Sequence, residues 1–213
     1  METAISTLDN IDQVVTEAVV AEYWERGYWI SPKLFNDDQI QRLRKAHDRL
    51  WARDFDYEIP SQYGVMPFDP DTPKVRQQVN AYWQSAEIRR AVTSPILGEM
   101  GARLMRVESV RLWHDQAIYK PGIGDGELTN AGNIGWRQDY GFWQACSTPN
   151  MCTAWVALQD TDLTNGGMRT IVGSHKWGLI EGSAAFGHKD LEQLAERFAS
   201  QGSRPDRPAF TTR

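Results

Sequence analysis

The spacing of the hydrophobic residues in this chain changes after residue 105. Before that point, residues 36–51 and 95–105 carry apolar side chains at the three- and four-residue intervals of a helix, and the short polar segment 85–90 is also predicted to be helical. Residues 110–119 then alternate between two faces, which is typical of a strand. The later apolar segments are short and are separated by glycine turns. This order predicts an α+β, mostly β fold, in which a double-stranded β-helix, the cupin-like jelly-roll, packs against N-terminal helices.

The clearest helix start in the sequence lies at Asn36. Its side chain is suited to cap the helix, and Gln39 is placed to complete a capping box. Phe35 and Ile40 flank this start in the positions of a hydrophobic staple. The helix should then bury one face, made of Ile40, Leu43, His47, Leu50 and Trp51. We interpret His47 as a residue at the edge of the core, because no carboxylate or second histidine accompanies it at a ligand spacing.

Other segments carry weaker local signals. Residues 22–30 predict a helix end, a break at Gly27 and a short strand, while the mostly apolar residues 152–158 predict a strand buried on both faces. The remaining expectations are a disordered terminus at 1–10, a surface loop at 60–73, a buried face of 95–105 made of Ile96, Leu97, Met100 and Leu104, a turn at 164–167 before a strand at 168–172, a helix at 190–200 and the start of a strand at 208–212.

The composition excludes several classes of protein. A chain of 213 residues with 41% hydrophobic and 24% charged residues is long enough for one sizeable core, so we expect a single domain over 1–213. The net charge of -5 and the pI near 5.4 argue against binding to nucleic acid. No apolar run has the length of a membrane span, and the N-terminus lacks a secretory signal. We therefore expect a cytoplasmic protein in which Cys146 and Cys152 are free thiols, with too few nearby histidines for a zinc site.

The segment 133–143, with the sequence NIGWRQDYGFW, contains the most informative chemical pattern. Arg137, Gln138 and Asp139 lie between a glycine-rich loop and an aromatic run. A histidine at position 137 would complete two of the three arms of the facial triad that holds non-haem Fe(II). The guanidinium of Arg137 cannot ligate, because it stays protonated and has no lone pair to offer a cation.

From residue 109 to residue 178 the chain resembles the phytanoyl-CoA dioxygenase family. The resemblance is carried, in the family's order, by SVRLWHDQAIYKPG, GWRQDYGFW, TAWVALQDT and NGGMRTIVGSHKWG. It implies an Fe(II)- and 2-oxoglutarate-dependent dioxygenase that oxidises a small molecule, such as a secondary metabolite or an acyl compound. The roles that it implies are metal ligation by Asp139, 2-oxoglutarate binding by Lys120, Gln138 and Trp155, and a substrate pocket lined by Arg137, Tyr140, Phe142 and Trp143.

The chain departs from the family pattern at two places. Arg137 stands where the family has its first histidine ligand, and no histidine follows His188, although the family has a distal histidine and a 2-oxoglutarate-binding arginine beyond the Gly-Ser-His turn. We interpret the faint echo of the distal turn at 201–203 as coincidence, and we expect the C-terminal strands of the jelly-roll to be incomplete. The open edges of such a barrel favour a partner, either a second copy of the chain or a complete paralogue.

Two interpretations of Arg137 are open. Arg137 either clamps a carboxylate, on a substrate or on Asp139, or marks a site that has lost its metal. His114 and His175 are candidates for a replacement ligand, although the turn at 173–175 is typical of a structural turn. Three classes of function follow: an oxygenase impaired in metal binding, a metal-free binding or regulatory module, and a fragment without activity of its own.

Overall fold

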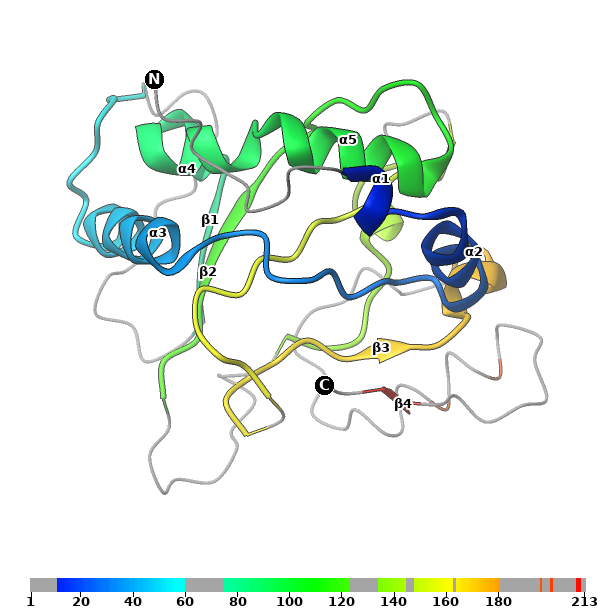
Figure 1. Ribbon diagram of the computed structural model, residues 1–213. Helices are drawn as coiled ribbons and strands as arrows, with labels where there is room; N and C mark the ends of the chain where they lie inside the picture. The colour runs from blue at the N-terminus through cyan, green and yellow to red at the C-terminus, as the bar shows by residue number, and fades with distance from the viewer. Residues whose placement is uncertain are drawn as a thin grey trace.

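The computed structural model describes residues 11–59, 75–122, 134–144, 148–162, 164–180, 196, 200 and 210–211. Its α-helices are α1 (Ile11–Val14), α2 (Glu17–Arg26), α3 (Asp37–Trp51), α4 (Ala86–Val92) and α5 (Pro95–Met105). Short 3-10 helices are η2 (Ala81–Trp83), η4 (Asp139–Gly141) and η5 (Ser174–Trp177), and the strands are β1 (Arg76–Val79), β2 (Gln116–Tyr119), β3 (Thr170–Ile171) and β4 (Phe210–Thr211). The predicted mixture of helices and sheet is confirmed (Figure 1), but the described residues form more helix than strand, so the mostly β character is not seen in them.

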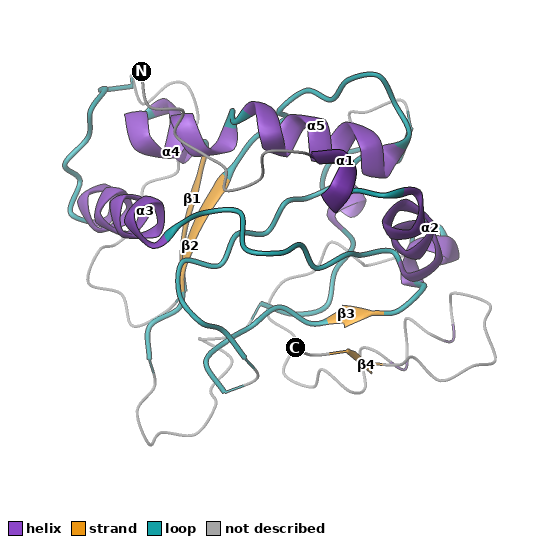
Figure 2. Ribbon diagram, in the orientation of Figure 1, coloured by secondary structure: helices purple, strands orange, loops and turns teal. Residues whose placement is uncertain are grey.

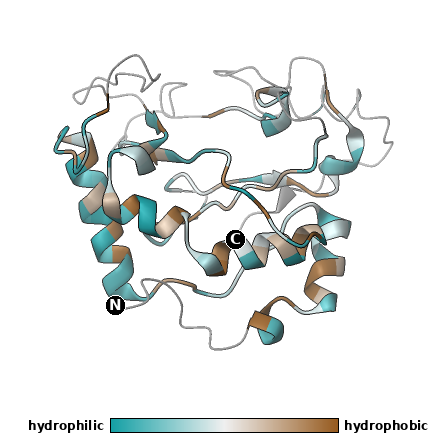
Figure 3. Ribbon diagram, turned by 90° about the horizontal axis from the view of Figure 1, so that it is seen from above, coloured by the Kyte–Doolittle hydropathy of each residue, from teal (hydrophilic) through white to brown (hydrophobic). Residues whose placement is uncertain are grey.

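The helices form one side of the molecule. In Figures 1 and 2, α4 and α5 follow each other along the top, with α3 packed against α4 and α2 packed against α5. The buried apolar residues form two main clusters, one around α1, α2 and α5 and the other between α3, α4 and β2. The α-helices show both hydrophobic and hydrophilic residues in Figure 3, as expected for helices that cover a core with one face.

Helix α3 is built as its sequence predicts. The side chain of Asn36 accepts the backbone N–H of Gln39 at 2.9 Å, and the side chain of Gln39 accepts the backbone N–H of Asn36 at 2.7 Å, so the capping box is complete. The apolar face packs inward, and Leu50 is only 1% exposed. His47 bonds the carbonyl of Leu43 at 2.8 Å, and burial lowers the pKa of its imidazole. It is therefore a residue at the edge of the core, as predicted.

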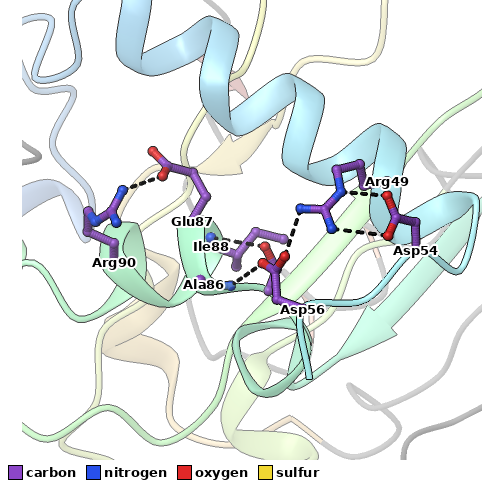
Figure 4. Close-up of polar contacts among 8 residues, drawn as sticks. Arg49, Asp54, Asp56, Ala86, Glu87, Ile88 and Arg90 are labelled. Atoms are coloured by element: carbon purple, nitrogen blue, oxygen red, sulfur yellow. Dashed lines mark hydrogen bonds and ion pairs between the residues drawn. The ribbon is translucent and has the colours of Figure 1, made fainter. Parts of the chain in front are cut away.

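A network of charges joins the end of α3 to the start of α4 (Figure 4). Arg49 forms a two-pronged contact with Asp54, at 2.6 and 3.1 Å, and reaches Asp56 at 2.7 Å. Asp56 also accepts the backbone N–H of Ala86 at 2.8 Å, the first residue of α4. That N–H and then Arg49 lower the pKa of the Asp56 carboxyl. The network ties residues 54–56 to the end of α3 and to the start of α4.

Strands β1 and β2 pair antiparallel, with Arg76 opposite Tyr119 and Gln78 opposite Ala117. The strand predicted at 110–119 is thus confirmed only over its last four residues, because residues 110–115 have no regular structure. Strand β1 escaped prediction. Its sequence, RQQV, has almost no apolar character and so gives no strand pattern. The segment is a strand because its backbone pairs with β2.

Two strand predictions are wrong. Residues 28–30 are irregular after the helix end at Gly27, which is itself confirmed. Residues 152–158 also form no strand, and Trp155 is 43% exposed rather than buried. Most side chains of residues 152–158 are exposed. The prediction was wrong because it inferred burial from the apolar composition of this run alone.

The remaining predictions have mixed outcomes. The turn at 164–167 is confirmed, with Gly166 at a φ of +92°, and the strand after it shortens to β3. Strand β4, within the predicted 208–212, pairs antiparallel with β3. The thiol of Cys152 is free, and burial raises its pKa. The expectations for 1–10, 60–73 and Cys146, and nearly all of 190–200, lie outside the described residues.

The described strands make two sheets of two strands each, so the double-stranded β-helix stays a prediction. In the same parts of the chain, no helix combines the length and the apolar character needed to cross a membrane.

Candidate active site

The candidate site is the turn at 137–143. Three backbone hydrogen bonds, each spanning three residues, close the turn: Gly141 to Gln138 at 2.9 Å, Phe142 to Asp139 at 3.0 Å and Trp143 to Tyr140 at 3.1 Å. This tight 3-10 geometry follows an extended Gln138. Asp139 is the first residue of η4, and Arg137 lies two residues before it.

Asp139 is bound through both of its carboxylate oxygens. Arg137 donates from Nε to Oδ1 at 3.3 Å, and Thr153 donates from Oγ1 to Oδ2 at 2.9 Å. Both members of the ion pair are partly buried, so water screens their attraction less than on an open surface. The pairing of Arg137 with Asp139 is one of the alternatives left open by the sequence. Thr153 was not foreseen, and the sequence signal for it is slight: a lone hydroxyl within an apolar run.

Gln138 joins the turn to a distant segment. Its amide nitrogen donates to the carbonyl of Gly178 at 2.7 Å, and its amide oxygen accepts the backbone N–H of Ile180 at 2.8 Å. Ile180 is buried against Trp136 and Trp177. Both polar groups of Gln138 therefore hold the backbone of 178–180, which gives this residue a structural task beside its predicted role in cofactor binding.

Lys120 lies beside the turn at 164–167. Its ammonium donates to the carbonyl of Gly166 at 3.2 Å, and a Cβ on Gly166 would lie 3.0 Å from Cδ of the lysine. The glycine thus leaves room for the lysine stem. Burial lowers the pKa of Lys120, and the positive charge of Arg137 lowers it further. The two cations are therefore close enough to repel each other.

The other predicted site residues are more open. Trp155 and Phe142 are exposed, and Tyr140 is partly buried. Trp143 packs edge-to-face with His114, with ring centroids 4.7 Å apart. The assignments of Lys120, Gln138 and Trp155 to a cofactor, of Asp139 to a metal and of Arg137, Tyr140, Phe142 and Trp143 to a substrate pocket stay predictions.

Both candidate replacement ligands, His175 and His114, contact backbone carbonyls. His175 bonds the carbonyl of Trp24 through Nε2 at 2.9 Å, so its turn is structural, as predicted. His114 approaches the carbonyl of Asp115 with Nδ1 at 3.3 Å. Across the described residues, no group of three histidine, cysteine, aspartate or glutamate side chains is arranged to hold a metal ion.

Comparison with known protein families shows which family this chain belongs to. A family model described as phytanoyl-CoA dioxygenase (PhyH) matches residues 23–196, which include every site residue above. The chain belongs to the phytanoyl-CoA dioxygenase family. Searches of curated proteins and of solved structures found no match.

Membership of the phytanoyl-CoA dioxygenase family implies an oxygenase-like function, and members of the family use Fe(II) and 2-oxoglutarate. The described residues of this chain do not fit the iron. Arg137 has no lone pair for a metal, and Asp139 has both oxygens engaged by protein donors. The contacts of Arg137 and Asp139 in this turn are therefore incompatible with the iron site that the family uses.

Proposed function

We propose that this protein is an oxygenase-like member of the phytanoyl-CoA dioxygenase family, directed at a small molecule such as a secondary metabolite or an acyl compound, with impaired metal binding. The ion pair of Arg137 with Asp139 carries this proposal. Iron would have to displace Arg137 and Thr153 from the two carboxylate oxygens. The displaced guanidinium would stay nearby, where its fixed positive charge repels a cation.

The proposal includes the double-stranded β-helix as the complete arrangement of strands, in a cytoplasmic protein that pairs with a second copy or a complete paralogue. Family membership and the antiparallel pairing of β3 with β4 support the barrel. Sedimentation of the purified chain tests the pairing, and a monomer at all concentrations contradicts a second copy as the partner.

Metal titration tests the impairment. Under anaerobic conditions, the chain should bind Fe(II) with a dissociation constant weaker than about micromolar. Arg137→His should tighten binding by about tenfold or more, because it removes a repelling charge and supplies a nitrogen ligand beside Asp139. Arg137→Gln is the matched control, because it removes the charge without adding an imidazole, and it should gain less.

Two outcomes contradict the impairment. Tight binding by the unchanged chain would mean that other ligands complete the site. An Arg137→His variant that gains no affinity would mean that the 137–139 turn does not face a metal position. A gain in affinity need not restore turnover, because the restored pair supplies only two protein ligands.

A second candidate function is metal-free binding of an anionic small molecule such as 2-oxoglutarate. The observation that favours it is the proximity of two cations, since the positive charge of Arg137 lowers the pKa of Lys120. A carboxylate ligand would relieve the repulsion between these cations. Such a protein would act as a binding or regulatory module.

Thermal melts with 2-oxoglutarate in the presence of a chelator test this alternative. Binding should stabilise the fold by about 2.7 kcal/mol at a hundredfold excess over the dissociation constant. Lys120→Met should remove the effect, whereas Lys33→Met, at an exposed lysine paired with Asp37, should leave it unchanged. If neither metal nor 2-oxoglutarate shifts the melt, a chain without activity of its own is the remaining class.

A further inference from the structure

The C-terminal end of α2 is completed by residues from far along the chain. The last carbonyls of a helix have no partners within it. Gly27 donates its N–H to the carbonyl of Tyr23 at 2.7 Å, which is a local cap. The carbonyl of Arg26 instead accepts the N–H of Gly173 at 2.8 Å, and the carbonyl of Trp24 accepts Nε2–H of His175 at 2.9 Å.

The ring of His175 fits this helix end because residue 27 is glycine. A Cβ on Gly27 would lie 2.2 Å from Nδ1 of His175, so any side chain there would displace the ring. Gly27 also has a φ of +84°, which disfavours other residues independently. The imidazole therefore occupies space that the helix end leaves open, and it is held there by a hydrogen bond rather than by loose contact.

The same segment continues to the candidate site. After η5, the carbonyl of Gly178 and the N–H of Ile180 bond the two polar groups of Gln138. Ile180 is 5% exposed and packs against Trp136, which precedes the site turn by one residue. Residues 173–180 thus touch α2 at one end and the residues next to Asp139 at the other.

We propose that residues 173–180 act as a strut between α2 and the site, and that His175 is a positioning residue that sets the place of Gln138 and of the 137–143 turn. The hydrogen bonds of residues 173–180 are the evidence for the strut itself. Its effect on metal binding depends in addition on the proposed function of the 137–143 turn. Lys176 adds an ion pair to Glu25 at 2.8 Å, but Glu25 is largely exposed, so this contact should contribute little.

Hydrogen exchange at the Ile180 amide tests the strut directly, because this N–H is bonded to Gln138. His175→Ala and His175→Phe should each speed its exchange by about tenfold or more relative to the amide of Leu50 in the α3 core. His175→Phe keeps a ring against Gly27 but cannot donate, so it decides the question if the alanine variant does not fold. His175→Gln, which can still donate to Trp24, should restore much of the protection, and Lys176→Gln is the matched control with little effect.

Unchanged exchange at Ile180 in the folded His175 variants would overturn the strut. Equal acceleration at Ile180 and Leu50 would also overturn it, because it would give His175 only a general role in stability.

A second measurement links the strut to the metal position. In the Arg137→His background, His175→Phe should abolish the gain in affinity for Co(II), used as a spectroscopic probe, and His175→Gln should retain it. If Arg137→His alone gains nothing, the proposed function fails while the exchange experiment still decides the strut. A full gain in the double variant with His175→Phe would show that His175 does not position the turn.

Discussion

Residues 11–119 and residues 134–180 are held together in different ways. The first region buries two apolar clusters beneath capped helices. The second, in its described parts, has little regular structure and a small apolar cluster around Ile180. Hydrogen bonds from Gln138 and Thr153 link its segments, and one from His175 joins it to α2. Stability in the first region should follow buried area, and order in the second should follow a few polar contacts.

The largest effect should come from truncating the core of the helical region. Leu50 is 1% exposed between α3 and α4, so Leu50→Ala should lower the free energy of unfolding by about 2–5 kcal/mol. Chemical denaturation followed by circular dichroism measures this change. A loss below about 1 kcal/mol would show that this cluster collapses around the cavity, and the contrast between the regions would weaken.

A smaller effect should depend on pH. Burial raises the pKa of Asp115 to about 6, although the N–H of Tyr82 and the nearby His114 oppose the shift. Folding therefore favours the protonated carboxyl, and this contribution is present at low pH and is lost as the pH rises through about 6. Asp115→Asn cannot ionise, so it should stabilise the fold at pH 7.5 by at most about 3 kcal/mol and change little at pH 4.

Denaturation of both proteins at the two pH values checks this expectation. The amide oxygen of the variant can still accept the N–H of Tyr82, which keeps the comparison close to one of charge alone. The same difference in stability at both pH values would rule out ionisation of Asp115 as its cause.

The smallest effect should come from the exposed tryptophan of the second region. Trp155→Ala should cost less than about 1 kcal/mol, because the side chain is 43% exposed and lies in no regular element. Trp51→Ala is the matched control, at 6% exposure in the α3 cluster, and should cost about 3–5 kcal/mol. Thermal melts compare the two variants. Equal losses would mean that residues 152–158 are packed as firmly as the helices.

Two pairs of hydrogen bonds explain how much the sequence could predict. Asn36 and Gln39 bond each other's backbone three residues apart, so the pattern can be recognised locally. Gln138 makes an equivalent pair of hydrogen bonds with residues forty and forty-two positions away. The residues next to Gln138 carry no pattern that predicts these bonds. The helices are predictable because their signals are local. Strand β1 and the role of Thr153 are not predictable, because both depend on partners far away in the sequence.

The candidate site shows the same division. The turn at Arg137, Gln138 and Asp139 was visible as a motif, and one of the pairings considered for Arg137 is observed. The second partner of Asp139, Thr153, is not visible as part of the motif. Thr153 lies in an apolar run whose sequence predicts a buried strand. Local patterns identified which residues matter, and only the folded backbone could show which of them meet.

The contact between Trp24 and His175 also affects the order of folding, because it spans 151 residues. Local capping at Gly27 can form as soon as α2 leaves the ribosome, but the carbonyls of Trp24 and Arg26 must wait for residues 173–175. At ordinary rates of synthesis this wait lasts on the order of ten seconds. Closing so long a loop also costs entropy that no local contact offsets. The last turn of α2 should therefore be among the late parts of the helical region to become fixed, and its completion should coincide with the ordering of the segment that reaches Gln138.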